Sequence, residues 1–343
     1  MLKVDDRLGC NILPGDASLM IEAWKLFAPA LLTMISFAVT SLIMPWLIGA
    51  LTRAGITGKD LHKPGNPEVP TMGGIAVFAG FAAAMTMSAV LQLDYRLLFA
   101  IFLSGTLAVI GGLIDDLFNL GQKTLVLLTF LIGIPVIAFR AGSTLVYLTP
   151  IGPADFGWVF WILVPFAFAF LMNGVNIYAG FNGLEAGLGI VSSVTLGVCA
   201  ILYGSLESAV SLFALAGGLF AFLRWNWFPA RIFIGGSGAF LLGSVFASSI
   251  IAGSIKVVGV IALFPYVMNF ILRGLDRFTW SVGVTLPDGM VTSAKRNALW
   301  ALFMHNSPTQ EPDLVRRCIL FQSIFGITAI AFAYYHVSLI GQT

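Results

Sequence analysis

Two acidic residues, Asp115 and Asp116, stand side by side at the end of a strongly apolar stretch. Residues 111–120 read Gly-Gly-Leu-Ile-Asp-Asp-Leu-Phe-Asn-Leu, and Lys123 follows. Neighbouring carboxylates repel each other, and ionisable residues at membrane depth are costly, so such pairs are usually functional. Carboxylates of this kind bind a divalent cation or act as a base. The alternative is a pair of helix-end acids that bind Lys123, and we favour the functional interpretation.

A second polar segment lies between two long apolar runs. Residues 173–187 read Asn-Gly-Val-Asn-Ile-Tyr-Ala-Gly-Phe-Asn-Gly-Leu-Glu-Ala-Gly. Unpaired polar groups cost several kcal/mol in lipid, so this segment must face water, a ligand or buried protein. Asn176 and Asn182 offer carbonyl oxygens to a hard cation or to a sugar or base, and Gly183 lets the backbone approach a ligand closely. The alternative is a polar patch that holds helices together.

Three further segments carry basic or glycine-rich runs: residues 59–74 with Lys63, residues 224–238, and the long stretch 274–317 with Arg277. Basic loops and exposed backbone N–H groups bind phosphate, and arginine can clamp a diphosphate. Each segment also has a plainer interpretation: a solvated turn, an aromatic belt at the membrane surface, and ordinary basic residues of the cytoplasmic side. Within the third segment, Asp288-Gly289 predicts a tight turn between short extended pieces.

The composition identifies the class of protein. The chain of 343 residues is 58% hydrophobic and 10% charged, with a mean hydropathy of +0.95. A soluble domain has about 25% charged residues. We therefore expect an integral membrane protein throughout. The net charge of +2 gives no sign of a nucleic-acid partner, and we expect none.

A helix needs about 20 apolar residues to cross a bilayer, and the sequence offers ten candidates. They lie at about 24–51, 73–91, 97–116, 123–139, 158–176, 184–203, 209–224, 237–254, 256–273 and 318–340. Prolines inside such spans are tolerated where neighbouring helices satisfy the freed backbone groups. The loop 140–157 is compatible with a short hairpin. The predicted fold is an all-α polytopic bundle of about ten transmembrane helices.

We expect one integral membrane domain, residues 1–343, whose loops on one side form the active site. These loops lie at about 52–72, 117–122, 177–183, 225–236 and 274–317. Ten spans place both termini on the opposite side. The 18 Lys and Arg residues then divide into twelve on the loop side and six on the terminal side. The excess of positive charge predicts that the loop side is cytoplasmic.

Four of these segments, in this order, resemble the polyprenyl-phosphate N-acetylhexosamine-1-phosphate transferases. They are Pro-Thr-Met-Gly-Gly at 70–74, Gly-Leu-Ile-Asp-Asp at 112–116, the segment 173–187, and Phe-Pro-Ala-Arg-Ile-Phe-Ile-Gly at 228–235. The resemblance covers residues from about 50 to 335. Bacterial branches of that superfamily typically show Asp-Gly-x-Asp-Gly where this chain has Ala-Gly-Phe-Asn-Gly at 179–183. That form resembles the eukaryotic and archaeal UDP-GlcNAc:dolichyl-phosphate GlcNAc-1-phosphotransferases.

The resemblance implies transfer of a sugar 1-phosphate from a UDP-N-acetylhexosamine to a polyprenyl or dolichyl phosphate, with release of UMP. It implies a cytoplasmic site that uses Mg²⁺, with Mn²⁺ as the alternative. By position, Asp115 and Asp116 resemble the acidic pair near the lipid phosphate and the metal, and Asp115 is also an expected metal ligand. The remaining expected site residues are Asn176 as a metal ligand, Asn182 as a uridine contact, Lys123 beside the phosphates, Arg277 as a diphosphate clamp, and Gly183, Glu185 and Lys63 in the substrate site.

One position departs from the family pattern. The fourth motif of the family reads Phe-x-Gly-Asp, and its aspartate is a principal metal ligand, whereas residues 233–236 here read Phe-Ile-Gly-Gly. Gly236 offers no side-chain oxygen. Three explanations compete: a variant or engineered substitution, a divergent enzyme that holds its metal through Asp115, Asp116 and Asn176, and an inactive paralogue that binds UDP-sugar or lipid phosphate without efficient turnover.

The leading hypothesis is therefore a glycosyl-1-phosphate transferase that catalyses the first membrane step of glycan assembly. The catalytically impaired paralogue is the second. A transporter is the third, and it is disfavoured because the polar residues gather at one face and no internal repeat is evident. We expect a multi-pass plasma-membrane protein with a cytoplasmic site, with the endoplasmic reticulum as the alternative. The sequence leaves open the sugar, the lipid length and the oligomeric state, a homodimer included.

Overall fold

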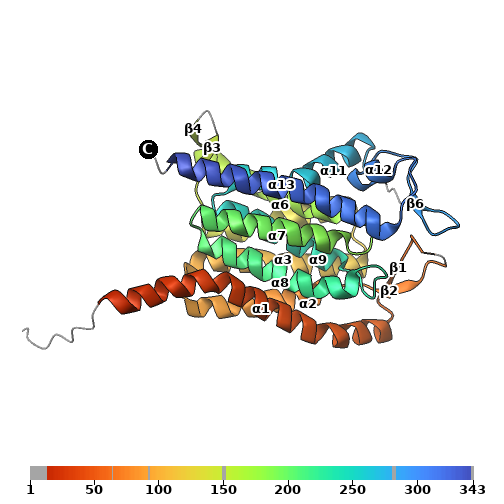
Figure 1. Ribbon diagram of the computed structural model, residues 1–343, viewed down its shortest axis with the longest axis horizontal. Coiled ribbons are helices and arrows are strands. Elements are labelled where there is room, and N and C mark those ends of the chain that lie inside the picture. Colours follow the sequence, from red (N-terminus) through yellow and green to blue (C-terminus); the bar gives the residue numbers. More distant parts are fainter. Residues whose placement is uncertain (1–13, 64, 92, 149–151, 280–282, 341–343) are drawn as a thin grey trace, which may run out of the picture.

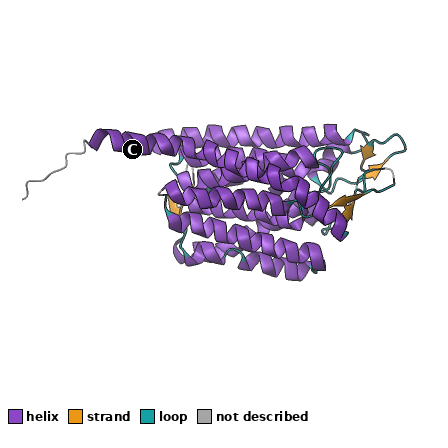
Figure 2. Ribbon diagram, turned by 90° about the horizontal axis from the view of Figure 1, so that it is seen from below, coloured by secondary structure: helices purple, strands orange, loops and turns teal. Residues whose placement is uncertain are grey.

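The protein is a bundle of long, roughly parallel helices with three short hairpins in the connecting loops (Figures 1 and 2). The computed structural model describes residues 14–63, 65–91, 93–148, 152–279 and 283–340. The first thirteen residues of the expected domain lie outside this set. The predicted fold, an all-α polytopic membrane protein, is confirmed.

The helices carry most of the described chain. They are α1 Pro14–Ala54, α2 Gly74–Ser88, the short 3-10 helix η1 Ala89–Leu91, α3 Tyr95–Phe118, α4 Gln122–Leu131, α5 Ile134–Ala138, α6 Gly157–Asn176, α7 Leu184–Leu202, α8 Leu206–Asn226, α9 Gly235–Ala252, α10 Lys256–Ala262, α11 Phe264–Leu275, α12 Leu299–Met304 and α13 Glu311–Ile340. The strands are β1 Thr57–Lys59, β2 Glu68–Pro70, β3 Leu145–Leu148, β4 Gly152–Asp155, β5 Val284–Thr285 and β6 Val291–Thr292.

The strands form antiparallel hairpins, β1 with β2, β3 with β4, and β5 with β6. Two of these confirm expectations from the sequence. The pair β3–β4 is the hairpin of the 140–157 loop, and its tip, residues 149–151, lies outside the described residues. The pair β5–β6 encloses the turn at Asp288-Gly289, where Gly289 has a φ of +80°.

Each of the ten expected spans coincides with a helix or a pair of helices, but fewer helices meet the length requirement for crossing. In the described part of the chain, seven helices are long and apolar enough, or eight if α10 and α11 form one span. The two other expected spans are the shorter apolar segments Gly74–Ser88 and Gln122–Ala138. They are shorter than the roughly 20 residues that a perpendicular crossing needs.

Two of the expected spans are interrupted at proline. Pro135 lies in the first turn of α5 and Pro265 in the first turn of α11. Proline lacks the N–H that a helix interior requires but fits the first turn, so a new helix begins there. The break between α10 and α11 bends the segment by 64°. In contrast, Pro29, Pro45 and Pro165 lie inside continuous helices.

Helix α13 begins earlier than the apolar pattern predicts. The expected span started at about 318, whereas the helix starts at Glu311. Its first turns carry Glu311, Asp313, Arg316 and Arg317, which a hydropathy criterion excludes. Acidic residues are nevertheless favourable in the first turn of a helix, and arginine is a good helix former. The loop expected at 274–317 therefore holds β5, β6, α12 and the first two turns of α13.

Helix α9 lies at the centre of the bundle. Every residue from Gly236 to Ala252 is buried, and α9 packs against α3 and α6 along most of its length. A helix that is buried all round must be apolar or small on every face. The glycines, alanines and serines of α9 meet this requirement. They also let α2 and α3 pack closely against the first turn of α9.

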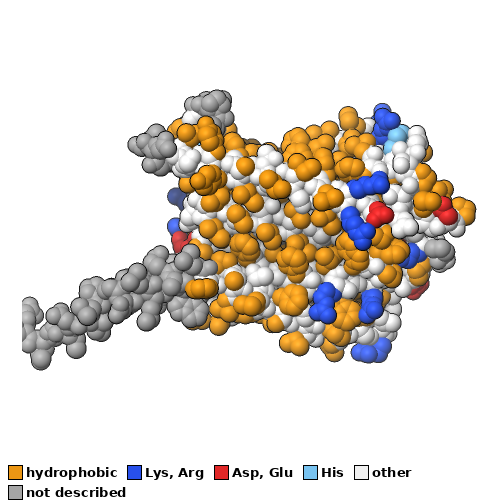
Figure 3. Space-filling view, viewed as in Figure 1, with side chains coloured by type: hydrophobic (Ala, Val, Ile, Leu, Met, Phe, Trp, Pro, Cys, Tyr) orange, Lys and Arg blue, Asp and Glu red, His pale blue; other side chains and the backbone are white. Residues whose placement is uncertain are grey.

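The two ends of the bundle differ. The described ends of the chain and the β3–β4 hairpin lie at one end, and β1, β2, β6 and α12 lie at the other (Figure 1). On the face shown in Figure 3, most Lys and Arg side chains gather toward the second end, whereas apolar side chains cover the middle. We call this second end the loop end. It is the end at which the candidate site residues lie.

Candidate active site

The acid pair lies in the last turn of α3 and contacts the first turn of α9. One carboxylate oxygen of Asp116 accepts the Gly236 N–H at 2.7 Å, and the other accepts the Ser237 N–H at 3.1 Å. Asp115 accepts the N–H of Leu120 at 3.0 Å. Exposed N–H groups and the helix dipole make the start of a helix a favourable place for an anion. These bonds hold both carboxylates in fixed positions beside α9.

Glycines allow the elements around the acid pair to approach one another. A Cβ added at Gly112 of α3 would lie 2.4 Å from the carbonyl oxygen of Gly236. A Cβ added at Gly74 of α2 would lie 2.2 Å from the backbone nitrogen of Gly238. Real Cβ atoms do not approach other heavy atoms so closely. The start of α2, the end of α3 and the start of α9 therefore meet through glycine backbones.

Position 236 faces both acids. A Cβ built on Gly236 would lie 3.1 Å from one carboxylate oxygen of Asp116 and 3.4 Å from one of Asp115. A side chain at this position would point between the two carboxylates. The carboxylate that the family pattern places here would therefore complete a group of three, the kind of arrangement that binds a hard cation.

The loop that precedes α9 is fastened to the loop that precedes α2. The N–H groups of Gly73 and Gly74 donate to the carbonyls of Phe233 and Ile234, both at 2.8 Å, and the Phe233 N–H donates to Pro70 at 2.8 Å. Two of the motifs found in the sequence, at 70–74 and 228–235, thus form one backbone-paired unit. This unit leads into α2 on one side and α9 on the other.

The turn between α6 and α7 occupies the same end of the bundle. Gly180 and Gly183 adopt φ angles of +128° and +81°, which favour glycine. The Gly183 N–H donates to the side-chain oxygen of Asn226 at 3.0 Å, and Asn226 in turn donates to the carbonyl of Ile232 at 2.9 Å. The turn of residues 177–183 is thereby joined to the loop before α9.

Asn182 is the most strongly held residue of this turn. The residue is only 4% exposed. Its backbone N–H donates to Glu311 at 2.6 Å, and its side-chain nitrogen donates to Asp60 at 3.1 Å. Asp60 also forms an ion pair with Lys63, and Lys63 lies over the ring of Phe228 at 4.9 Å.

A cavity of about 180 Å³ opens beside these residues. Its walls mix polar and aromatic side chains, as expected for a polar organic ligand. They come from the β1–β2 loop, the α6–α7 turn, the first turn of α7, the end of α8 and the loop before α9. The lining residues are Lys59, Asp60, Leu61, His62, Gly180, Phe181, Asn182, Glu185, Asn226 and Phe233.

The structure brings together some of the expected site residues. Asp115 and Asp116 are adjacent to Gly236, whereas Asn182 and Glu185 line the cavity and Gly183 follows in the same turn. Lys63 is held at the cavity through its ion pair with Asp60, which is one of the lining residues.

Three expected residues are not tied to this group by the described contacts. Lys123 is exposed in the first turn of α4, and none of the ion pairs found among the described residues includes it. Arg277 is exposed and has a φ of +54°. Asn176 ends α6 and is half-buried, and no hydrogen bond joins it to either acid in the described chain. The roles of these three residues therefore remain predictions.

Sequence reasoning missed four residues of this site: Asp60, His62, Asn226 and Glu311. Asp60 and His62 lie inside the segment 59–74 that was singled out, so their polarity beside Lys63 was a usable signal. Asn226 gave no comparable signal within the aromatic run 225–228. Glu311 stands in an ordinary helix-start sequence, and the residue it binds is 129 positions away.

His62 is enclosed in the site. It stacks on Phe181 with ring centroids 4.3 Å apart, and its backbone N–H donates to Asp60 at 3.4 Å. Burial lowers the pKa of His62 below its ordinary value of 6.5, although the nearby Asp60 carboxylate acts in the opposite direction and Lys63 in the same one. The folded protein therefore favours the neutral imidazole.

We expect His62 to make the folded state less stable in acid. The unfolded chain takes up a proton near pH 6.5, whereas the folded chain resists it, so stability falls as the pH drops through 6.5 toward the lower folded pKa. One proton gives a slope of at most about 1.4 kcal/mol per pH unit. Melting curves in detergent from about pH 8 to pH 5 should show a steeper loss for the wild type than for His62→Gln. Parallel curves would contradict this assignment.

The fold and this end of the bundle define a class: a polytopic membrane protein with an acid pair and a polar, glycine-rich cavity at one end. Comparison with known proteins identifies the family. The pattern described as Glycosyl transferase family 4 matches residues 98–254. The chain is 31% identical over 311 residues, 87% of its length and 94% of the relative's, to a Sulfolobus acidocaldarius protein provisionally named UDP-N-acetylglucosamine–dolichyl-phosphate N-acetylglucosaminephosphotransferase.

Two other relatives are also sugar-phosphate transferases by name. A Saccharolobus solfataricus protein with the same provisional name is 32% identical over 253 residues, 73% of this chain and 79% of its own. A phospho-N-acetylmuramoyl-pentapeptide-transferase of Desulforamulus reducens is 28% identical over 279 residues, 72% of this chain and 83% of its own. The chain belongs to glycosyl transferase family 4, the membrane transferases that move a sugar 1-phosphate to a polyprenyl phosphate.

Proposed function

We propose that this protein transfers N-acetylglucosamine 1-phosphate from UDP-N-acetylglucosamine to a polyprenyl phosphate of the dolichyl type and releases UMP. The observation that carries the proposal is the position of the acid pair at the start of α9, at the same end of the bundle as the cavity lined by Asn182 and Glu185. The names of the archaeal relatives support the choice of donor and acceptor.

In the proposed reaction, an oxygen of the lipid phosphate forms a bond to the β-phosphorus of the UDP-sugar. The bond between that phosphorus and the bridging oxygen breaks, and its electron pair leaves with UMP. The bond between the sugar and its phosphate stays intact. Negative charge gathers on the phosphates, so the site must present cationic and N–H groups to them. We propose Lys63, which pairs with the cavity residue Asp60, for this role, and Lys123 remains a candidate.

The acid pair fits a divalent cation. Mg²⁺ is usually held by one or two carboxylates together with substrate phosphates and water. Asp115 and Asp116 supply two carboxylates, and no group of three His, Cys, Asp or Glu suited to a metal occurs among the described residues. We propose that these two acids hold Mg²⁺, or Mn²⁺ in its place, with Asn176 as a candidate third ligand. The ion would neutralise phosphate charge when it is bound.

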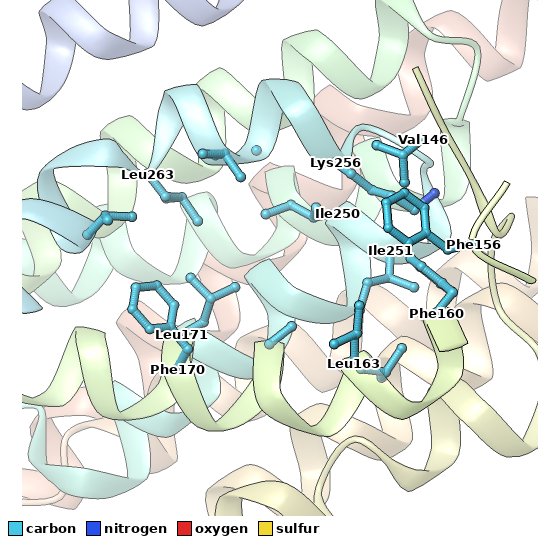
Figure 4. A pocket seen from close by; sticks show the side chains of 15 residues that line it. Val146, Phe156, Phe160, Leu163, Phe170, Leu171, Ile250, Ile251, Lys256 and Leu263 are labelled. Atoms are coloured by element: carbon cyan, nitrogen blue, oxygen red, sulfur yellow. The ribbon is translucent and has the colours of Figure 1, made fainter. Parts of the chain in front are cut away.

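An apolar groove offers a place for the lipid chain. A cavity of about 290 Å³ lies between α6, α9, α10 and α11, and its lining includes Phe160, Phe170, Ile250 and Leu263 (Figure 4). It reaches Leu171 on α6, five residues before Asn176, which is about 7.5 Å along a helix. A polyprenyl chain in this groove would bring its phosphate to the loop end. We place that end on the cytoplasmic face of the plasma membrane.

The test is release of UMP from UDP-N-acetylglucosamine by the purified protein in detergent with Mg²⁺. We expect release that depends on added polyprenyl phosphate and stops when EDTA removes the cation. Release that is independent of the lipid phosphate would indicate hydrolysis and contradict the proposal.

A second function is favoured by one observation, the absence of a carboxylate at Gly236. A protein that binds the UDP-sugar and the lipid phosphate but turns them over poorly would have the same fold and cavity. Binding of UDP-N-acetylglucosamine without UMP release under any divalent cation would support this second function.

A further inference from the structure

The side-chain amide of Asn182 is held by a buried carboxylate. Its nitrogen donates to Asp60 at 3.1 Å, while its backbone N–H donates to Glu311 at 2.6 Å. Asp60 and Glu311 are each only 3% exposed. Buried acids of this kind form strong hydrogen bonds, because little water competes with them. Asn182 is thus anchored both to the β1–β2 loop and to the start of α13.

Asp60 decides which way the amide of Asn182 faces. An ionised carboxylate can only accept hydrogen bonds, so the group of Asn182 that faces it must be the NH₂. Amide orientation is assigned from the hydrogen-bond network, and here the partner leaves a single choice. The carbonyl oxygen is left without a partner among the described contacts, and Asn182 lines the cavity. The carbonyl oxygen of the Asn182 side chain is therefore a hydrogen-bond acceptor in the wall of the cavity.

Asp60 is itself held in place. It forms the ion pair with Lys63 and accepts the His62 backbone N–H at 3.4 Å. Its neighbours on the chain are fixed by the β1–β2 hairpin, in which Lys59 pairs with Glu68. The Lys63 ammonium pairs with the same carboxylate oxygen of Asp60 that accepts from the Asn182 side chain. The orientation of the amide therefore does not depend on the bound ligand.

We propose that Asp60 is a positioning residue that sets base specificity, because it fixes Asn182 as an acceptor for the imide N–H of uracil. This inference rests on the proposed function, in which the donor is a uridine nucleotide. Cytosine has an acceptor nitrogen at the same ring position, so it would face the Asn182 oxygen with two lone pairs opposed. A site that leaves buried polar groups unpaired rejects such an analogue strongly.

The test is the ratio of binding constants for UDP-N-acetylglucosamine and CDP-N-acetylglucosamine on the full chain in detergent. Binding at equilibrium is measured so that the result does not depend on turnover. We expect the wild type to prefer the uridine compound by roughly tenfold or more. In Asp60→Asn, the new amide can donate as well as accept, so Asn182 can turn its NH₂ toward the base. The preference should then collapse to within about threefold.

One control separates specificity from general damage. Glu68→Gln removes one charge from the same hairpin, where the Glu68 side chain accepts a hydrogen bond from the Thr57 hydroxyl at 3.0 Å and makes no other hydrogen bond among the described residues. It should leave the binding ratio unchanged. If Asp60→Asn fails to fold, Asn182→Ala removes the acceptor directly and should collapse the ratio in the same way.

The outcomes separate this inference from the proposed function. Equal binding of both nucleotides by the wild type, or an unchanged ratio in the folded Asp60→Asn or Asn182→Ala protein, overturns the role of Asp60 while UMP release can still stand. An equal loss of both affinities in Asp60→Asn also overturns it, since that is the effect of a merely structural residue. Binding of neither nucleotide by the wild type overturns both.

Discussion

Replacing Gly236 by aspartate is expected to raise the Mg²⁺-dependent transfer rate at limiting cation by roughly 10- to 1,000-fold. A side chain at this position points between Asp115 and Asp116, whose nearest oxygens lie 3.4 and 3.1 Å from the added Cβ. A third carboxylate there increases the charge and the number of ligands available to a divalent cation. The rate is measured as UMP release over a Mg²⁺ titration.

The same substitution should lower stability when no cation is present. Three carboxylates at contact distance repel one another, and a bound cation removes that repulsion. We therefore expect the melting temperature of Gly236→Asp to lie below that of the wild type in EDTA and to rise more on addition of Mg²⁺. Gly236→Ala controls for the added Cβ and Gly236→Asn for the size of the side chain. A folded Gly236→Asp protein with wild-type cation dependence would show that position 236 does not face the metal.

Replacing Asp116 by asparagine is expected to reduce transfer by roughly 1,000-fold and to destabilise the protein by about 1 kcal/mol. Asp116 uses both carboxylate oxygens, one on the Gly236 N–H and one on the Ser237 N–H. Asparagine keeps one oxygen as an acceptor, and its NH₂ group then faces the second of these two N–H groups. It also removes the negative charge, which is favourable at the start of a helix and beside a cation.

A matched control lies at the other end of the same helix. Asp94 caps α3 by accepting the Arg96 N–H at 2.9 Å. Asp94→Asn should cost a similar or smaller amount of stability, and it should leave UMP release at the wild-type rate. Asp116→Asn that retains full transfer, or Asp94→Asn that abolishes it, would remove the acid pair from the proposed chemistry.

Much of the helical bundle could be predicted because apolar run length is a local property. The segment 184–203 was expected and α7 spans Leu184–Leu202. The predictions were wrong where local hydropathy does not determine where a helix begins, ends or breaks. The start of α13 was not predicted because its first turns are charged. Two expected spans are each divided at a proline, because a residue without an N–H is favoured in the first turn of a new helix. The expected span 73–91 ends as the 3-10 helix η1, Ala89–Leu91, which the length of an apolar run does not distinguish from α-helix.

The site was partly predictable for a similar reason. Adjacent acids and clustered amides are costly in an apolar chain, so Asp115, Asp116 and Asn182 could be singled out without a structure. Their partners could not. Asp60 and Glu311 lie 122 and 129 positions from Asn182. Each resembles an ordinary loop or helix-start acid until the fold brings it to the turn of residues 177–183.

The central claim is that this end of the bundle moves a sugar together with its phosphate. The most direct measurement uses UDP-N-acetylglucosamine labelled at the β-phosphorus, incubated with the wild-type protein, a polyprenyl phosphate and Mg²⁺. The account predicts that the β-phosphorus label passes to the lipid fraction in equal amount with the sugar, while the α-phosphorus leaves as UMP. Transfer of the sugar without the β-phosphorus, or no transfer by the wild type and by Gly236→Asp alike, would contradict it.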